Sequence, residues 1–242
     1  MRIRQHAALG LAATACLVLS GCTNAADWNA NRSSQIHSYD TSSIQAQPDI
    51  IAKLPRGALE DGVLDVAAST DYAPAEFLDP SGKAVGYDVD LTNAIAAVLG
   101  VKGKVHTAEF DSIIASIGSK YDAGISSFTV TPERIAEVNM TAYINVGSRF
   151  NVQAGNPKGV ETSDHLKLCG RTIGVQVGTA QETTMRDAAD KCAQAGKPVL
   201  SVRSYSKQSE ATTGLVGGTI DATYSDSTVA GYAVELTDSQ IV

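Results

Sequence analysis

The stretch Thr172-Ile173-Gly174-Val175 is a short apolar run that predicts a buried strand, and a helical pattern follows it from about Thr179 to Ala195. The same alternation repeats further along the chain. A strand is expected over Pro198–Val202, a helix over Gln208–Leu215, and a strand over Ile220–Tyr224 that leads into a last helix. Strands that alternate with helices predict an α/β fold, in which mainly parallel sheets are covered on both faces.

An earlier set of elements has the same character. It comprises strands at Val63–Ala68, Val105–Ala108 and Asp122–Ser126, and helices at Asp88–Leu99 and Asp111–Ile117. The two sets join near residues 145–155, so we expect two lobes, 61–150 and 151–242, with a cleft between them. Ligands of open α/β sheets bind beyond the carboxyl ends of the strands, which would face this cleft.

Charge and composition exclude some classes of partner. The 242 residues include 19 Lys and Arg against 26 Asp and Glu, which gives a formal charge of −7. This balance argues against nucleic acid as a partner. Collagen-like, coiled-coil and multi-span membrane proteins are excluded by composition.

The first 21 residues have the pattern of a secretory signal. A short cationic start is followed by an apolar run, Ala7–Leu19, which is too short to span a bilayer. Its end, Leu19-Ser20-Gly21-Cys22, resembles the bacterial lipobox and implies lipidation of Cys22 followed by cleavage before it. An ordinary signal with a chance cysteine is the alternative. Residues 22–60 are polar and aperiodic, so we expect a lipidated cysteine and a flexible tether.

The remaining cysteines indicate an oxidising compartment. Cys16 leaves with the leader and Cys22 takes the lipid, so Cys169 and Cys192 remain in the exported body. An even pair in this setting favours a disulfide. The alternative, a metal site, has only His165 nearby and no CxxC or HExxH pattern. We therefore expect neither a metal nor a cofactor.

Three polar features follow predicted strands and converge on the expected cleft. Thr129 leads to Arg134, Gly178-Thr179-Ala180-Gln181 opens a helix, and Asp226 follows the last strand. An arginine fork and a helix N-terminus suit a carboxylate, and an aspartate with hydroxyl and carbonyl oxygens suits an ammonium group. Together they describe a site for a zwitterionic α-amino acid. Alternatively, Arg134 is a surface charge and Asp226 only a helix cap.

Several motifs resemble one protein family in order and spacing. They are Tyr72-Ala73-Pro74-Ala75-Glu76-Phe77, Gly86-Tyr87-Asp88-Val89-Asp90-Leu91, Ser126-Ser127-Phe128-Thr129-Val130-Thr131-Pro132-Glu133-Arg134, Val177-Gly178-Thr179 and Tyr224-Ser225-Asp226-Ser227. The chain resembles the polar-amino-acid branch of bacterial extracellular solute-binding proteins, which deliver substrate to ABC importers. The resemblance implies a two-lobe, periplasmic-binding-protein-like clamp of type II that binds a free amino acid, without enzymatic chemistry. It also implies a monomeric lipoprotein on the extracytoplasmic face of the membrane, with the permease subunits as partners.

The resemblance also implies roles for individual residues. Arg134 and the N–H groups of Thr129 and Ala180 would hold the ligand carboxylate, and Asp226, the Thr129 hydroxyl and the Ser127 carbonyl its ammonium group. The other expected contacts are Tyr72 and Phe110 on the ligand side chain and Thr179 at the helix start.

Two departures from the family pattern lead to further expectations. Ala75 stands where the family usually has an aromatic residue, so we expect a roomier pocket wall or one in which Phe77 takes that place. Family members return to the first lobe near the point where this chain reaches Val242, so we expect the C-terminal return to lobe 1 to be missing and this form to fold poorly or bind weakly. An enzyme on the same fold (cyclohexadienyl-dehydratase-like or cell-wall lytic) and a non-transporting sensor or remnant are the alternatives.

Three acidic residues near these motifs have simpler interpretations. Asp88 and Asp90 flank a predicted helix start and are interpreted as helix caps. Asp71, beside Tyr72, is interpreted as a surface residue of a loop, with contact to a cationic ligand side chain as the alternative.

Overall fold

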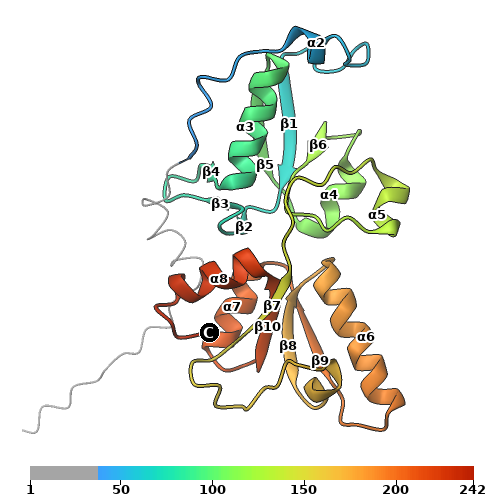
Figure 1. Cartoon of the computed structure of the whole chain (residues 1–242), viewed down its shortest axis with the longest axis vertical. Helices are drawn as coiled ribbons and strands as arrows, with labels where there is room; N and C mark the ends of the chain where they lie inside the picture. Colours follow the sequence, from blue (N-terminus) through green and yellow to red (C-terminus); the bar gives the residue numbers. More distant parts are fainter. Residues whose placement is uncertain (1–37) are drawn as a thin grey trace, which may run out of the picture.

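The structure is a computed structural model that describes residues 38–242, and it has two α/β lobes (Figure 1). The predicted α/β class is confirmed. The expected signal peptide, Cys22 and the tether up to residue 37 lie outside the described residues.

The first lobe is built around a parallel sheet with the strand order β5-β1-β6. Successive residues of β1 face opposite sides of this sheet, as a strand requires. Val66 packs with Ala96 of α3 on one face, and Ala67 packs with Ile113 of α4 on the other. The elements of this lobe are α2 (Pro48–Ile51), β1 (Val63–Ala68), β2 (Asp71–Tyr72), β3 (Glu76–Leu78), β4 (Ala84–Val85), α3 (Tyr87–Leu99), β5 (Lys102–Thr107), α4 (Phe110–Ser116), β6 (Ala123–Gly124) and α5 (Pro132–Glu137).

The second lobe is built around a sheet with the order β7-β10-β8-β9. Strands β10, β8 and β9 are parallel, whereas β7 runs antiparallel to β10. Helix α6 contacts β8 and β9, and α8 contacts β7 and β10. The elements are β7 (Ser148–Val152), η2 (His165–Leu168), β8 (Thr172–Gln176), α6 (Ala180–Gln194), β9 (Ser201–Tyr205), α7 (Gln208–Val216), β10 (Ala222–Asp226) and α8 (Ser227–Leu236).

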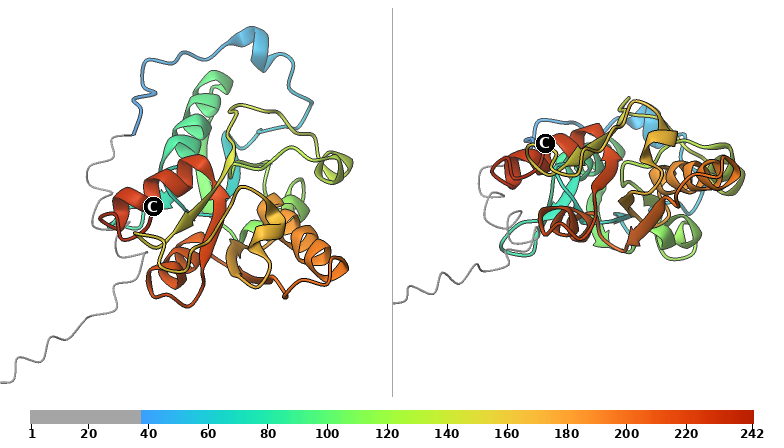
Figure 2. Two further views of the ribbon diagram at one scale, coloured as in Figure 1. Left: turned by 60° about the horizontal axis from the view of Figure 1, so that its bottom comes forward. Right: turned by 90° about the horizontal axis from the view of Figure 1, so that it is seen from below.

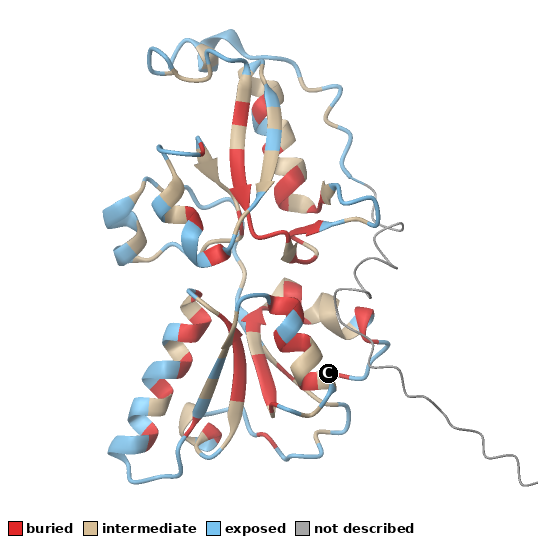
Figure 3. Ribbon diagram, turned by 180° about the vertical axis from the view of Figure 1, so that it is seen from behind, coloured by how far each residue is buried: buried red, intermediate tan, exposed pale blue. Residues whose placement is uncertain are grey.

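The central strands of both sheets are buried, and the outer faces of the helices are exposed (Figure 3). In lobe 2, Ile173 and Val175 of β8 pack with Met185 of α6. This pattern is the one that the apolar runs and helical periodicity predict.

Strand β9 differs from its prediction. The strand was expected over Pro198–Val202, but it runs from Ser201 to Tyr205 and pairs with β8 from Thr172↔Ser201 onward. Pro198 lacks the N–H that a sheet requires, and Val199 is 75% exposed. The apolar run therefore begins before the strand.

A small antiparallel sheet, β2-β3-β4, was not predicted. Strands of two or three residues are too short for a period of two to be recognised. This sheet contacts lobe 2: Phe77 and Val85 pack with Tyr232 of α8, and Tyr72 packs with Val229 of the same helix. The two lobes therefore touch along α8 (Figure 2).

A single described segment, residues 138–147, connects α5 of lobe 1 to β7 of lobe 2. Because β7 begins at Ser148, the crossing lies slightly before the expected boundary at residue 150. Within residues 38–242, β6 has a strand partner along one edge alone, and its other side lines a cavity together with residues 138–141 and Tyr143.

Residues 38–60, the part of the expected tether that the structure describes, contain a helix and contacts to lobe 1. Helix α2 lies within this part, and the Gln47 N–H donates a 2.9 Å hydrogen bond to the carbonyl of Val98. Leu59 packs on the cluster around Leu64 and Val66. These contacts need partners that are distant in the sequence, so the polar composition did not reveal them. Among the described helices, none has the length and apolar character needed to cross a bilayer.

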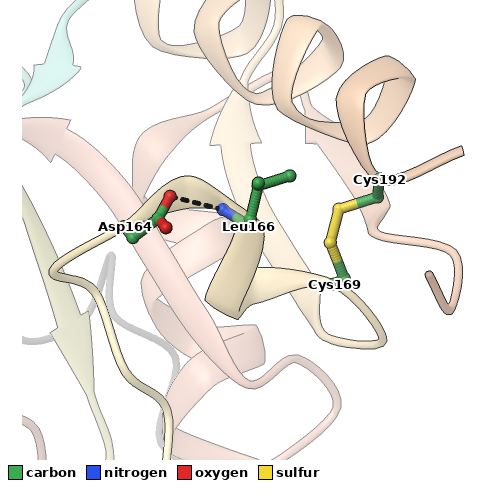
Figure 4. The surroundings of a disulfide bond; sticks show 4 residues. All are labelled: Asp164, Leu166, Cys169 and Cys192. Carbon is green, nitrogen blue, oxygen red and sulfur yellow. Dashed lines mark hydrogen bonds between the residues drawn. A yellow bond between two sulfur atoms is a disulfide. The ribbon is translucent and has the colours of Figure 1, made fainter. Parts of the chain in front are cut away.

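The predicted disulfide between Cys169 and Cys192 is present, with a Cα–Cα distance of 5.6 Å. It links the end of η2 to the last turns of α6 (Figure 4). Helix η2 is capped by Asp164, whose Oδ1 accepts a 2.9 Å hydrogen bond from the Leu166 N–H. The cross-link therefore lies at the opposite end of α6 from the helix N-terminus that the sequence places in the site.

Candidate functional site

Arg134 is held where the two lobes meet. Helix α5 begins after its cap, Thr131, whose hydroxyl accepts a 3.3 Å hydrogen bond from the Arg134 N–H. The Arg134 guanidinium donates to the carbonyl of Thr129 in lobe 1 (2.8 Å) and to that of Gly178 in lobe 2 (3.0 Å). It also lies 5.2 Å from the ring centroid of Phe128. Burial lowers the pKa of Arg134, while the Asp226 carboxylate opposes that shift, so the side chain stays cationic.

Asp226 forms the anionic counterpart. It ends β10, precedes α8 and is 6% exposed. Its Oδ1 accepts a 2.8 Å hydrogen bond from Gln181 Nε2, and its backbone N–H donates to the Tyr72 hydroxyl (3.2 Å). Its carboxylate makes no capping hydrogen bond to α8, so the interpretation of Asp226 as a simple cap does not hold. Burial raises the pKa of Asp226, and the hydrogen bond from Gln181 is the largest influence in the other direction.

The N-terminus of α6 enters the same site. Thr179 caps this helix, because its hydroxyl accepts from the Glu182 N–H (3.1 Å) and donates to the Gln176 carbonyl (2.7 Å). The first N–H groups of a helix have no intrahelical acceptor, so those of Ala180 and Gln181 are free to bind an anion. The Thr179 hydroxyl therefore makes both of its hydrogen bonds within the protein.

All eight residues that the sequence proposes for ligand binding line one small cavity between the lobes. Lobe 1 contributes five of them and lobe 2 three. They are Tyr72, Phe110, Ser127, Thr129, Arg134, Thr179, Ala180 and Asp226. Two further residues line the cavity that the sequence reasoning did not assign, Ser126 and Gln181. Gln181 is the last residue of the helix-start motif Gly178-Thr179-Ala180-Gln181. Its place in that motif was a signal that could have identified it as a site residue.

The aromatic side of the cavity is fixed by stacking. Phe110, the first residue of α4, stacks on Phe128 with ring centroids 4.5 Å apart. Tyr72 is 6% exposed and packs with Ala75 and Val229. Ala75 is fully buried in this cluster, and neither Ala75 nor Phe77 lines the cavity.

Two acidic residues have roles that differ from their sequence interpretation. Asp88 does not cap α3, whose N-cap is Gly86 without any side-chain bond. Asp88 instead accepts hydrogen bonds from Ser127 and Tyr143, which are 39 and 55 residues away. Asp90 also makes no cap, and its Oδ2 accepts from the Tyr39 N–H (2.9 Å). All three partners come from tertiary folding, which a local motif cannot reveal.

Asp71 is not a surface residue of a loop. It lies in β2, where its Oδ1 accepts a 2.9 Å hydrogen bond from the Ser69 hydroxyl. Burial raises the pKa of Asp71 to about 6, against the opposing influence of Ser69, the N–H groups of Ser209 and Gln208, and Lys207. Asp71 of lobe 1 therefore faces the N-terminus of α7 in lobe 2.

No cluster of three or more His, Cys, Asp or Glu residues suited to a metal occurs within residues 38–242. The polar groups of the cavity are instead a cation, an anion and free backbone donors, which suits an organic zwitterion.

The family model for bacterial extracellular solute-binding proteins, family 3, matches residues 64–236. The chain is 30% identical over 238 residues to the arginine-binding protein ArgT of Corynebacterium glutamicum, covering 97% of this chain and 75% of that protein. It is 33% identical to an L-arginine-binding protein of Pseudomonas aeruginosa, over 73% of this chain and 65% of that protein.

Among solved structures, an ancestral arginine-binding protein bound to arginine matches with a TM-score of 0.68 and 32% identity. The match covers 75% of this chain and 77% of the ancestral protein. These relatives are named as binding proteins, and this chain is likewise a binding protein and not an enzyme. With a family match that spans most of the described body, the chain belongs to the bacterial extracellular solute-binding proteins of family 3, which serve ABC importers of polar amino acids.

Proposed function

We propose that this protein captures a free α-amino acid between its two lobes and delivers it to the permease of an ABC importer. The observation that carries the proposal is that Arg134 and Asp226 line the same cavity from opposite lobes. A ligand that contacts both lobes favours the closed form through its differential affinity for that form.

The ligand carboxylate would bind at the Arg134 pole. The guanidinium offers directed donors, and the N–H groups of Thr129 and Ala180 would complete the set. The rings of Phe110 and Phe128 lie 5.6 and 5.2 Å from the guanidinium carbon and keep it from turning into solvent. This arrangement supports recognition of an anion.

The ligand ammonium group would bind at the Asp226 pole. An ammonium has three donors, and the Asp226 carboxylate, the Thr129 hydroxyl and the Ser127 carbonyl are three acceptors in the same cavity. Gln181 holds the carboxylate in place from the second lobe. Removing a buried charge partner of this kind typically costs several kcal/mol of binding, of order 2–5.

The ligand side chain would lie against Tyr72 and Phe110. Proteins similar to this chain are named for arginine, and one similar ancestral structure holds glutamine. L-Arginine is therefore the first ligand to test, and L-glutamine the second.

Export and anchoring complete the proposal. The family is extracellular by its description, which supports an exported protein. We propose that Cys22 carries the lipid that anchors a monomeric protein to the extracytoplasmic face of the membrane. Replacing Cys22 by Ser should release the protein into the medium, whereas retention of the Cys22→Ser variant on the membrane would contradict the anchor.

The binding proposal is tested by calorimetric titration of the purified chain with three related compounds. L-Arginine has both charged poles, its methyl ester lacks the carboxylate, and 5-guanidinopentanoate lacks the α-ammonium group. We expect L-arginine to bind more tightly than either analogue. Equal affinity for all three, or no thermal shift with any of the twenty amino acids, would contradict the zwitterion site. Loss of radiolabelled uptake in cells that lack the gene would support delivery to a permease.

A further inference from the structure

A buried acidic cluster lies beneath the loop that ends β6. Asp88 is 1% exposed and Glu76 is fully buried. Glu76 accepts a hydrogen bond from the Ser126 hydroxyl, and Asp88 accepts from the adjacent Ser127. The cluster therefore supports two consecutive residues that line the ligand cavity.

Asp88 holds Ser127 by two hydrogen bonds. Its Oδ2 accepts from the Ser127 N–H at 2.9 Å and from the Ser127 hydroxyl at 3.1 Å. Ser127 has a φ of 48°, a left-handed conformation that disfavours residues other than glycine. Such a conformation persists when surrounding contacts fix it. The left-handed turn at Ser127 also decides where its carbonyl points.

The other oxygen of Asp88 reaches the segment that connects the lobes. Asp88 Oδ1 accepts a 2.7 Å hydrogen bond from the hydroxyl of Tyr143, which lies within residues 138–147. Burial and the nearby Asp88 carboxylate both raise the pKa of Tyr143, so the phenol remains a neutral donor. One carboxylate thus joins the Ser127 loop to the crossing between the lobes.

Glu76 does not compete with Asp88 for the hydrogen bonds that Ser127 and Tyr143 donate. Burial raises the pKa of Glu76 well above its ordinary value, and the neighbouring Asp88 carboxylate raises it further. Two adjacent buried carboxyl groups cannot both be charged without a large cost, so Glu76 carries the proton. One oxygen of Asp88 accepts from Ser127 and the other from Tyr143.

We propose that Asp88 is a positioning residue for the ligand's ammonium group. Asp88 lies outside the set of residues that line the cavity, and it acts by holding Ser127 in the conformation that presents its carbonyl to the ligand. Through Tyr143 it ties that conformation to the crossing segment. This inference rests on the proposed function, because the ammonium contact of the Ser127 carbonyl belongs to that proposal.

The test uses variants that remove the Asp88 contacts in steps. Asp88→Ala removes all three hydrogen bonds. Asp88→Asn keeps the shape and one acceptor oxygen, and Tyr143→Phe removes the single bond from the crossing segment. Asp90→Asn is the matched control, because Asp90 lies in the same turn of α3 and its carboxylate accepts a hydrogen bond from the Tyr39 N–H rather than from Ser127. Circular dichroism establishes that each variant is folded before titration.

We expect Asp88→Ala to weaken L-arginine binding about tenfold or more, which corresponds to the loss of one charge-assisted contact. It should weaken binding of 5-guanidinopentanoate, which lacks the α-ammonium group, by roughly threefold at most. Asp88→Asn and Tyr143→Phe should show smaller losses with the same preference. An equal loss for both compounds, or no loss for L-arginine, would overturn the positioning role.

A second measurement needs no ligand. In the ligand-free protein, amide hydrogen exchange at Ser127 should be faster in Asp88→Ala than in the wild-type chain and unchanged in Asp90→Asn. Unchanged exchange in Asp88→Ala overturns the inference whichever amino acid is bound. A wild-type chain that binds no amino acid contradicts the proposed function, whereas a wild-type chain that binds while Asp88→Ala binds equally well contradicts the inference alone.

Discussion

The guanidinium of Arg134 in lobe 1 donates a 3.0 Å hydrogen bond to the backbone carbonyl of Gly178 in lobe 2. Close by, Gln176 of lobe 2 donates a 3.2 Å hydrogen bond to the Ser69 hydroxyl of lobe 1. The lobes are therefore joined by direct polar contacts around the cavity. A residue that the ligand would contact is also part of the junction between the lobes, so binding and closure share the same groups.

Replacing Arg134 by Lys keeps the charge but removes the planar fork of donors. We expect the affinity for L-arginine to fall by about 2 kcal/mol or more, roughly thirtyfold, in calorimetric titration. Arg171→Lys is the control, because the Arg171 side chain is bound to the carbonyl of Gly159, away from the cavity. Equal affinity in Arg134→Lys and Arg171→Lys would exclude a carboxylate fork.

Replacing Asp226 by Asn preserves the shape and removes the negative charge. We expect about 2 kcal/mol of lost binding energy for L-arginine and much less for 5-guanidinopentanoate, which has no α-ammonium group to bind. Asp187→Asn, at an exposed position of α6, is the control. The prediction fails if the two compounds lose affinity to the same degree.

Gly178→Ala tests the close approach of the lobes. Gly178 has a φ of +75°, and an added Cβ would lie 2.8 Å from the Cβ of Asp111 in lobe 1. Gly196 has a similar φ of +62° with nothing within 4 Å of such a Cβ, so Gly196→Ala carries the backbone strain without the clash. We expect Gly178→Ala alone to increase the radius of gyration in X-ray scattering and to weaken binding. Identical behaviour of the two variants would contradict this.

Removing the Cys169–Cys192 disulfide should destabilise lobe 2 without changing the site. The bond closes a loop with a sequence separation of 23, for which the chain-entropy model gives about 3 kcal/mol. We expect a loss of this order for Cys169→Ser/Cys192→Ser in urea denaturation. Ligand affinity measured well below the transition should remain unchanged, since the cross-link lies at the far end of α6. A large loss of affinity in the folded variant would show that the cross-link shapes the site.

The pKa of Asp71, raised to about 6 by burial, predicts a pH-dependent stability. Between pH 4 and 6 the folded protein retains a proton that the unfolded chain releases, so this residue's contribution to stability falls as the pH rises through that window and is constant above it. The Asp71→Asn variant lacks this dependence. The free energy of unfolding of the wild type, relative to the variant, should fall by about 1–3 kcal/mol from pH 4 to pH 7. Parallel curves for the two proteins would contradict the shift.

The main elements could be predicted from the sequence because their signals are local. The apolar run at Thr172–Val175 and the helical pattern from about Thr179 to Ala195 identify β8 and α6 before any contact is known, to within one residue at each end. The start of α5 has a local signal of the same kind, with Thr131 as the cap and Pro132 in the first turn. The short strands β2 to β4 were missed, because two or three residues are too few to show the alternation of a strand. These strands instead depend on pairing with one another and on packing against α8.

From periodicity and residue chemistry, the sequence by itself predicted the α/β alternation and the disulfide pair, and its resemblance to a family supplied the full set of eight residues proposed for the site. Only the tertiary structure decided what Asp71 and Asp88 do. Asp71 meets the start of α7 across the lobe boundary, and Asp88 meets Ser127 and Tyr143 from other parts of the chain. The physical reason is that a buried carboxylate takes its role from the donors that folding brings to it, and for Asp88 these donors lie 39 and 55 residues away in the sequence.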